Sequence, residues 1–484
     1  MNRGHSLRTL VVGAGEAGRA LARDLRAAPE YGLSPVGFLD DDPAKTGIDG
    51  VPVLGTLASV GTVAAAQHVE VVVVAIPLLA RHIFRQVAAG AASAGASIRY
   101  LPSFVDALER EVVGSDMRSL DLQRLLGRRE VHVATDGIRE CIEGKRVLVT
   151  GAGGSIGSEL CRQAYGFNPD RLLMLDHDES NLNRMQLELW SEQRLESPDA
   201  VVADIRDRAR LAHIFDQFLP EVVFHAAAHK HLPLLEHNAS EAVKSNVVGT
   251  ENVVRAAEAH GTQRLINIST DKAADPTSIL GATKRVAELI VSAYADASTF
   301  ASVRFGNVLG SRGSLLTVLT EQIRAGVPVT VTHRDATRFF MTIEEAAGLV
   351  LEASRLATKG AIFVLDMGDP VRIVDIVEAF AAQLHIPDIR IRYTGLRPGE
   401  KLSETLFSGQ ETYEQTEHPR ILKATNGHVD EDFWLHLADL SLAATRNDDR
   451  AVRQSLARLL PDYRPPRELT APVAAAPAPY VAAY

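Results

Sequence analysis

The chain has 484 residues, of which 46% are hydrophobic and 23% are charged, so it can form two or three folded domains and is not disordered as a whole. Its net charge of −10 argues against a general nucleic-acid-binding protein, because phosphate contacts need a basic surface. The two cysteines, Cys141 and Cys161, are too few for a disulfide framework and lack metal-ligand spacing, which favours a reducing cytoplasm as the location.

No stretch of the sequence predicts a membrane span or a secretory signal. The N-terminal residues Met1 to Ser6 contain no apolar core. The most apolar run, Val71 to Ala80, contains Pro77 and has about half of the roughly 20 residues that a spanning helix needs. We interpret this run as a buried strand.

The first domain begins with a glycine fingerprint. The apolar residues Leu10 to Val12 lead into Gly13, Gly15 and Gly18, and a helix-like segment and a strand that ends at Asp40 follow. Strand, glycine turn, helix and acidic strand end are typical of a dinucleotide-binding fold. We predict a Rossmann-like domain over residues 1–130 and a connection over 131–144. The fingerprint is a weaker signal for function than for fold, because no set of proton-transfer residues follows it. The domain therefore either binds a nucleotide or serves as a scaffold.

A second fingerprint follows the strand-like residues Val147 to Val149. Its glycines lie between Gly151 and Gly157, and the next predicted strand ends in Asp176, about 20 residues further on. An acidic residue at that distance can accept hydrogen bonds from the adenosine ribose and repel a 2′-phosphate, so the sequence predicts NAD rather than NADP.

The following predicted strands extend this cofactor site. Asp204 follows a strand at a position that suits contact with adenine, and the small residues after His225 allow a cofactor to pass close to the backbone. The fold class is therefore α/β, with two Rossmann-like doubly wound parallel sheets in tandem, the second with a smaller C-terminal substrate-binding subdomain. The predicted cofactor-binding residues are Gly151, Gly154, Ser155, Ile156, Gly157, Asp176, Asp204, Ile205, Ala226 and Lys284.

The fifth predicted strand, Leu265 to Ile268, ends in Ser269-Thr270-Asp271-Lys272, and Lys284 follows one short segment later. A hydroxyl, a carboxyl and two amines at a strand's carboxyl end are proton-transfer groups at the edge where open α/β sheets bind ligands. The alternative is a polar strand end that caps the next helix. Neighbouring Asp and Lys side chains stabilise each other's charged forms, so we expect a pair with coupled protonation. The two side chains can converge only if the strand has ended before them.

Five motifs follow one another along the sequence: Thr150-Gly-Ala-Gly-Gly-Ser-Ile-Gly157, His225-Ala-Ala-Ala-His-Lys230, Ser269-Thr-Asp-Lys272, Val303-Arg-Phe-Gly-Asn307 and Leu396-Arg-Pro-Gly-Glu-Lys401. Together they resemble the extended short-chain dehydrogenase/reductase superfamily. Within it, the chain is similar to the bacterial polysaccharide-biosynthesis nucleotide-sugar 4,6-dehydratases that act on UDP-N-acetylglucosamine. The likeness spans about residues 144–424, and it implies NAD as cofactor and a UDP-sugar as substrate.

The resemblance implies an internal redox cycle in which a hydride leaves C4, water is lost across C5 and C6, and the hydride returns to C6. The superfamily's catalytic tyrosine is replaced here by Leu280, four residues before Lys284. By resemblance, Lys284 binds the nicotinamide ribose and assists deprotonation, with Thr270 near the 4-hydroxyl. Asp271 is then the acid at the C6 oxygen and Lys272 the base at C5.

The resemblance also implies cations for a pyrophosphate. Arg397 is the first candidate, and Arg304, Arg312 and Arg338 are further ones, since guanidinium groups bind phosphate oxygens in pairs. Glu400 is placed to accept from the uridine ribose, and Lys230 and Asn307 fall where relatives line the substrate. The spacing of the histidines from His225 to His237 fits no common zinc pattern, so we predict no metal site.

The remaining expectations concern domain limits and alternatives. We predict a catalytic domain over residues 145–430, a helical segment over 431–463 and a disordered Pro- and Ala-rich tail over 464–484. A homo-oligomer is expected, with no nucleic-acid partner and no membrane span. Two other functions stay open: a nucleotide-sugar 4-epimerase or reductase, and a non-catalytic dinucleotide sensor.

Overall fold

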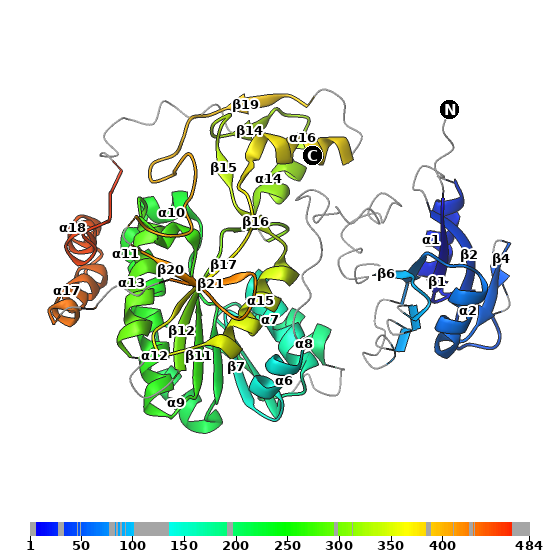
Figure 1. The fold of residues 1–484 in the computed structure, drawn as a ribbon, viewed down its shortest axis with the longest axis horizontal. Helices are drawn as coiled ribbons and strands as arrows, with labels where there is room; N and C mark the ends of the chain where they lie inside the picture. Colours follow the sequence, from blue (N-terminus) through cyan, green and yellow to red (C-terminus); the bar gives the residue numbers. More distant parts are fainter. Residues whose placement is uncertain are drawn as a thin grey trace. The chain divides into compact units, whose positions relative to one another are not determined.

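The computed structural model describes residues 6–27, 33–45, 47–48, 50–76, 83, 86–87, 90–91, 93–100, 135–190, 197–294, 299–311, 313–383, 389–409, 411–424, 429 and 431–466. The chain divides into two compact units, residues 1–121 and 122–484. Each unit is built on a mainly parallel sheet with helices packed against it, which confirms the predicted α/β fold class (Figure 1). Most of the predicted disordered tail, from residue 467 onward, lies outside the described residues.

The N-terminal unit is organised around a strand of four valines, Val71 to Val74, all of them buried. Such a run is typical of a parallel strand that is covered on both faces. Helix α1 (Glu16–Ala27) packs on one face of the sheet and helix α2 (Val60–Ala66) on the other. Across the sheet the strands are β3 (Gly47–Ile48), β4 (Val51–Gly55), β2 (Leu33–Leu39), β1 (Leu7–Val12), β5 (Val71–Val74) and β6 (Ser97–Tyr100), all parallel to their neighbours except β3, which is antiparallel to β4.

The second unit contains a nine-stranded sheet. Its first seven strands are parallel to their neighbours, and two antiparallel strands extend one edge. Across the sheet they are β9 (Ala200–Val202), β8 (Arg171–Asp176), β7 (Arg146–Thr150), β10 (Val222–His225), β11 (Arg264–Ile268), β12 (Thr299–Arg304), β17 (Ile362–Leu365), β21 (Ile421–Ala424) and β20 (Tyr413–Gln415).

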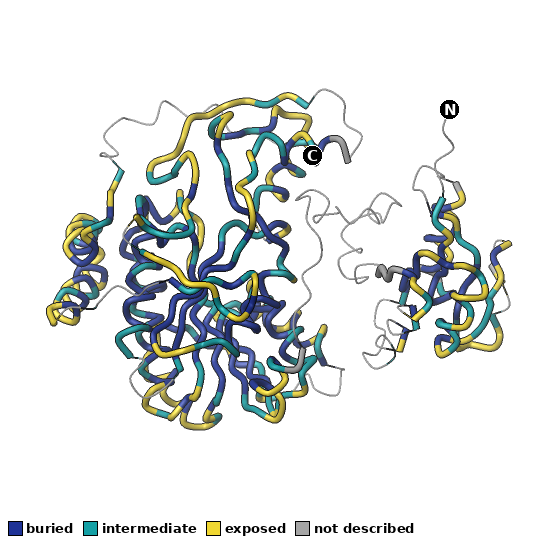
Figure 2. The backbone as a smooth tube through the Cα atoms, in the orientation of Figure 1, coloured by how far each residue is buried: buried dark blue, intermediate teal, exposed yellow. Residues whose placement is uncertain are grey.

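Two layers of helices cover this sheet, and its strands are largely buried (Figure 2). A large apolar cluster lies on each face, and a small third cluster contains Ile362, Val364 and Ala424. The two large clusters follow from the alternation of side chains along each strand, which sends successive apolar residues to opposite faces. One face carries α9 (Arg208–Phe218), α11 (Ala239–Val243), α12 (Gly249–Ala259) and α13 (Ile279–Ala293); the other carries α6 (Thr135–Ile142), α7 (Ser155–Gly166), α8 (Glu179–Leu189) and α15 (Ile343–Leu356).

The stretch that we expected to be only a connection, residues 131–144, includes a packed helix. Ile138 and Ile142 of α6 are fully buried in the same cluster as α7 and α15. Its apolar residues are four apart, so they share one face of the helix, and burial of that face against α15 stabilises the short helix.

Smaller elements follow β12 and form a layer beside the ends of the parallel strands (Figure 1). After the sheet, two C-terminal helices pack on the α11 and α13 side through Phe433, Leu437 and Leu456. The additional elements are β13 (Asn307–Val308) paired with β16 (Phe340–Met341), β14 (Val329–Val331) with β19 (Ile391–Tyr393), β15 (Thr337–Arg338) with β18 (Val371–Arg372), helices α10 (Leu232–His237), α14 (Leu315–Arg324), α16 (Ile373–Gln383), α17 (Phe433–Thr445) and α18 (Asp449–Leu459).

Candidate active site

The strand that carries the predicted catalytic residues ends just before them. β11 stops at Ile268, and a short 3₁₀ turn over Asp271–Ala273 begins after Thr270. The Thr270 hydroxyl caps this turn by accepting a hydrogen bond from Lys272 N (3.4 Å). The turn removes the strand alternation that would send the two side chains to opposite faces, and Lys272 Nζ lies 2.9 Å from Asp271 Oδ1.

Asp271 is fully buried, and its two carboxyl oxygens have different surroundings. Oδ1 accepts hydrogen bonds from Lys272 Nζ and from the Thr270 hydroxyl at 3.0 Å. Oδ2 is buried and has no hydrogen-bond donor among the described residues. A Cβ added to Gly306 would lie 2.8 Å from Oδ2, so the glycine makes room for this oxygen. A buried, unpartnered carboxyl oxygen is costly in a purely structural role, which favours a functional one.

Among the described residues, the Lys272 amine has three oxygen neighbours. Besides Asp271, its Nζ lies 3.3 Å from Asn307 Oδ1 and 3.8 Å from Glu404 Oε1. Burial by itself would lower the pKa of the Lys272 amine, but the carboxylates of Asp271 and Glu404 outweigh burial and raise that pKa above its usual range. The resting amine is therefore an ammonium group.

Lys284 lies in α13, whose first turn is capped by Ser278 through Gly281 N (3.1 Å). The Lys284 side chain is buried, and this burial lowers its pKa to about 8, while the Glu288 carboxylate opposes the shift. Leu280, one helical turn earlier, is also buried and brings no proton-transfer group. The two lysines therefore differ, since Lys272 is held as a cation and Lys284 is shifted toward the neutral form.

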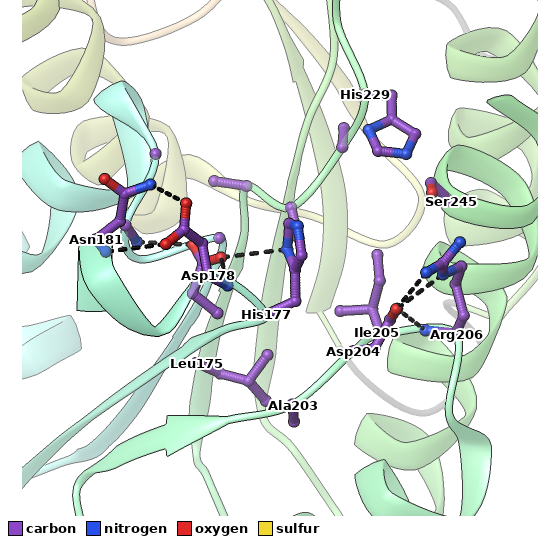
Figure 3. A pocket seen from close by; sticks show the side chains of 17 residues that line it. Leu175, His177, Asp178, Asn181, Ala203, Asp204, Ile205, Arg206, His229 and Ser245 are labelled. Carbon is purple, nitrogen blue, oxygen red and sulfur yellow. Dashed lines mark hydrogen bonds and ion pairs between the residues drawn. The ribbon is translucent and has the colours of Figure 1, made fainter. Parts of the chain in front are cut away.

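A pocket of about 210 Å³ opens where the glycine loop after β7 meets the ends of β8, β9 and β10 (Figure 3). Gly151 there has φ of +68°, and a Cβ at Gly157 would lie 2.0 Å from Gly151 O, so only glycine lets the helix pack this close to the loop. Of the predicted cofactor residues, those that line the pocket are Gly151, Gly154, Asp176, Asp204, Ile205 and Ala226.

The other predicted cofactor residues lie outside the pocket lining. Ser155, Ile156 and Gly157 form the first turn of α7 directly after the glycine loop, and Lys284 is further along the sheet edge in α13. The α7 helix therefore begins at the pocket, and its N-terminal backbone N–H groups suit a phosphate group.

Asp176 holds the glycine loop in place. Its Oδ2 accepts from Gly153 N at 2.8 Å, and its Oδ1 accepts from Asp178 N at 3.0 Å. Each carboxylate oxygen can accept a second hydrogen bond, so Asp176 can still accept from a ribose hydroxyl. Sequence reasoning missed Arg206, which lines the same pocket and pairs with Asp204, with Nε 2.9 Å from Oδ2 (Figure 3). The hydrogen bond from Arg206 lowers the pKa of Asp204.

A π-helical segment, Lys244–Val248, joins α11 to α12 beside the site, and sequence reasoning missed it. It places the buried Asn246 amide so that Oδ1 accepts from His229 N (2.8 Å), while Nδ2 donates to His229 O (3.0 Å) and to Thr283 Oγ1 (3.2 Å). Asn246 thus links the loop after β10 to the residue that precedes Lys284. A π-helical turn inside a helix often marks a functional site, although no sequence pattern announces it.

The predicted substrate residues are spread along one side of the second unit. Arg397 is exposed and its side chain has no ion pair among the described residues. Arg338 is buried and donates to Glu400 Oε1 (2.7 Å), so these two predicted substrate groups contact each other. Asn307 contacts Lys272, Lys230 is exposed after β10, and Arg312 lies outside the described residues.

The suggestion that Arg304 is a phosphate-binding cation is wrong. Arg304 is fully buried and its guanidinium is shared between Glu288 (Nε to Oε1, 2.7 Å) and Glu411 (Nη1 to Oε2, 2.7 Å). Both carboxylates are buried partners, and they leave the group no access to a ligand. Arg304 therefore has a structural role.

The described part of the chain was searched for metal-binding clusters and for membrane-spanning helices, and it contains neither. It contains no group of three or more His, Cys, Asp or Glu side chains arranged to hold a metal ion. None of its helices is both long and apolar enough to cross a membrane.

The sequence was compared with known families and proteins. A family model described as "Polysaccharide biosynthesis protein" matches residues 147–426, and one described as "CoA-binding domain" matches residues 1–102. Among curated relatives, the probable polysaccharide biosynthesis protein EpsC of Bacillus subtilis is 41% identical over 428 residues, which is 86% of this chain and 71% of the relative. A UDP-N-acetylglucosamine 4,6-dehydratase (inverting) of Campylobacter jejuni is 32% identical over 278 residues, covering 56% of this chain and 79% of the relative.

The second unit is also similar to a solved structure. Pen from Bacillus thuringiensis is 32% identical with a TM-score of 0.53, over 58% of this chain and 89% of that one. The family model spans more than half of the chain, and the Bacillus subtilis relative matches most of it. The chain belongs to the polysaccharide biosynthesis protein family.

Proposed function

We propose that this protein is an NAD-dependent nucleotide-sugar 4,6-dehydratase that converts UDP-N-acetylglucosamine into the UDP-4-keto-6-deoxy sugar for a surface polysaccharide or glycan. The observation that carries the proposal is the pair of unequal oxygens on Asp271. Oδ1 is held by Thr270 and Lys272, whereas Oδ2 is buried without a donor. Such a carboxyl group can hold a proton and deliver it to a leaving oxygen.

The residues that line the pocket beside the glycine loop suit the adenosine half of NAD. The loop and the start of α7 suit the pyrophosphate, and Asp176 suits the adenosine ribose and opposes a 2′-phosphate. Lys284 and the end of β11 are the protein groups for the nicotinamide side. NAD bound there would supply a hydride acceptor for C4 of the sugar and a hydride donor for C6, so the cycle would need no external reductant.

Thr270 links the sugar's 4-hydroxyl to Asp271. In this proposal, the 4-hydroxyl proton passes to the Thr270 oxygen as the Thr270 proton moves to Asp271 Oδ1, 3.0 Å away. Asp271 then gives a proton to the departing C6 hydroxyl, which leaves as water. The proton lost at C4 is thus the one that completes the water, and the carboxylate is regenerated.

Lys272 acts at C5, next to the new 4-keto group. As Asp271 gives its proton to the C6 oxygen, the Lys272 ammonium passes one of its own protons to the Asp271 carboxylate, which leaves a neutral amine beside a protonated acid. The neutral amine removes the C5 proton and later returns a proton to that carbon, after which Asp271 returns its proton to the amine and the resting pair is restored. The raised pKa of Lys272 suits this second step, because it makes the ammonium the resting form.

Lys284 assists where the usual tyrosine is absent. Its pKa, lowered to about 8 by burial, makes about one tenth of the amine neutral at pH 7, far more than an ordinary lysine would have. Leu280 cannot carry a proton, so Thr270 and Lys284 share the task of deprotonating the 4-hydroxyl.

The substrate's UDP part is assigned to the loop that contains Arg397 and Glu400. Arg397 is exposed and its guanidinium is available to a pyrophosphate. Glu400 Oε2 accepts only from Arg397 N among the described contacts (3.2 Å), so it retains capacity to accept from a ribose hydroxyl.

The alternatives make different use of the same residues. An epimerase or reductase needs the tyrosine that Leu280 replaces, and it would have no need for the Asp271 and Lys272 pair. A dinucleotide sensor would have no reason to keep a buried carboxyl oxygen without a donor.

The reaction is tested by isotope position. Substrate deuterated at C4 and converted in ordinary water is expected to give a 4-keto product with deuterium at C6, and unlabelled substrate in heavy water is expected to gain deuterium at C5. Mass spectrometry and proton NMR locate both labels. Return of the label to C4 would identify an epimerase, and absence of any product would favour a sensor; either result contradicts the dehydratase.

A further inference from the structure

A third buried carboxylate lies beside the proposed catalytic pair. Glu404 is 6% exposed; its Oε1 lies 3.8 Å from Lys272 Nζ, and its Oε2 lies 3.3 Å from Lys401 Nζ. The chain of charges therefore runs from Lys401 through Glu404 and Lys272 to Asp271. Glu404 is 132 residues (404 minus 272) from Lys272 in the sequence, so only the fold brings the two together.

The segment that contains Glu404 is docked along the stretch between the two catalytic lysines. Lys401 Nζ donates to Ala274 O (2.9 Å), and the Thr277 hydroxyl donates to Gly399 O (3.0 Å). Further along, Gly409 N donates to Asp275 Oδ2 (3.1 Å). The loop with Arg397 is thus fastened to the turn that holds Asp271 and Lys272.

We propose that Glu404 is a positioning residue for Lys272. Glu404 holds the amine of Lys272 in place and couples it to the substrate loop, Arg397 to Lys401. This inference rests on the proposed dehydratase function. The coupling lets binding energy from the distant UDP part of the substrate fix the amine opposite C5, where misplacement by about 1 Å can cost about 100-fold in rate.

The charges around Lys272 explain why a second carboxylate is needed. When Asp271 takes up a proton to act as the acid, it no longer compensates the positive charge of a neighbouring ammonium. Glu404 does so, because it is placed between the ammonium groups of Lys272 and Lys401. The remaining groups that face Lys272 are the Asn307 amide and the Arg338 guanidinium, and neither supplies negative charge.

The kinetic test compares Glu404→Gln with Glu414→Gln. Glu414 is exposed in β20 and pairs with Lys423 (2.9 Å), so its substitution removes one carboxylate from the same region without touching Lys272. Glu404→Gln is expected to lower kcat about 10- to 100-fold. KM for the UDP-sugar should change little, because Lys401 and Thr277 still fasten the loop. The limb of the pH–rate profile that reports the amine should move to lower pH, since a negative neighbour of the ammonium is lost. Glu414→Gln should behave as the wild type.

A second variant separates loss of the contact with Lys272 from loss of the fold. Glu404→Asp keeps the negative charge but moves it away from Lys272, because the side chain is shorter. The pH–rate profile of this variant is expected to resemble that of the wild type, whereas its kcat should stay below the wild-type value. Thermal unfolding of both variants checks that the fold is kept. Unchanged kcat and an unchanged pH–rate profile in Glu404→Gln would overturn the inference.

A direct measurement makes the test independent of turnover. Trace acetylation of the lysines across a pH series, read by mass spectrometry of the peptide that contains Lys272, gives the pH at which this amine becomes reactive. Glu404→Gln is expected to move that midpoint to lower pH. The same midpoint in wild type and variant would refute the role of Glu404, even if the protein proved to have another activity. A shifted midpoint in a protein that makes no 4-keto product would instead retain the contact and contradict the dehydratase function.

Discussion

The amine of Lys272 lies 2.9 Å from Asp271 Oδ1, whereas Oδ2 of the same carboxyl group is buried without a donor among the described residues. In this geometry the Lys272 ammonium contacts Oδ1, and Oδ2 can carry the proton that passes to the substrate. The geometry also accounts for how an acid and a base can be sequence neighbours. The pair shares one proton, and its position depends on the step of the reaction.

Removal of either member of this pair should abolish most of the activity. Asp271→Asn and Lys272→Ala are each expected to lower kcat by about 100-fold or more, the usual contribution of an acid or base group. Steady-state assay of the 4-keto product measures this. NAD content should be unchanged, because neither residue lines the cofactor pocket. Lys423→Ala, which removes a lysine paired at the surface with Glu414, is the control. Near-normal turnover in either variant would remove that residue from the mechanism.

The space beside Asp271 Oδ2 gives a steric test. The added methyl group in Gly306→Ala would lie 2.8 Å from Oδ2 and 3.0 Å from Met367 Cε, so the carboxyl group must move. We expect a loss of about 100-fold in kcat, since a displacement of about 1 Å can have that effect. Gly409→Ala, where no atom lies within 4 Å of the added Cβ, is the matched control. Equal rates for the two variants would show that the position of Oδ2 is unimportant.

The lowered pKa of Lys284 predicts the pH dependence of the first step. Burial lowers this pKa to about 8, so the neutral amine that assists deprotonation is scarce at pH 6 and predominates above pH 8. We expect kcat to rise with pH through about 8 in the wild type. Lys284→Arg, which stays charged throughout this range, should lose that limb. The test is to measure kcat against pH for both proteins. If kcat rises in the same way in Lys284→Arg, the rise belongs to a group other than Lys284.

The buried pair of Glu288 and Arg304 predicts loss of stability in acid. Burial alone would raise the pKa of Glu288, but the guanidinium of Arg304 lowers it to about 2. Because the folded-state pKa is below the ordinary value of 4.5, this contribution is fully present above pH 4.5 and is lost as the pH falls toward 2.

Glu288→Gln should therefore lower the free energy of unfolding near pH 7 by about 3 to 5 kcal/mol, since it leaves Arg304 partly unpaired. Urea unfolding measures the change. The surface variant Glu414→Gln should change the free energy of unfolding by less than about 1 kcal/mol. A similar small effect for Glu288→Gln would contradict the structural role of Arg304.

The nucleotide pocket predicts that the protein retains its cofactor. We expect NAD to be released on denaturation of the purified protein, because the cycle returns the cofactor to its starting state. Asp176→Ala removes the acceptors of Gly153 N and Asp178 N and is expected to reduce the bound NAD. Chromatography of the denatured supernatant identifies the nucleotide. NADP as the main species would contradict the role of Asp176.

The features that the sequence predicted are those that depend on neighbours in the chain. The glycine loops, the acidic strand ends, the valine strand Val71–Val74 and the spacing from Leu280 to Lys284 are local patterns, because strands and helices have fixed periods. These patterns sufficed for the α/β fold class and for the pocket residues from Gly151 to Ala226. They also placed Thr270, Asp271 and Lys272 together at a strand end.

The tertiary structure decided which charges have partners. The sequence offered Arg397 as the first phosphate ligand and Arg304 as a further candidate, and the structure separates the two: Arg304 is buried between Glu288 and Glu411, while Arg397 is exposed. Glu404 meets Lys272 only because its segment folds back across the turn after β11. The free energy of a charged group depends on desolvation and on the charges within a few ångströms, and in a folded chain those charges come from distant parts of the sequence.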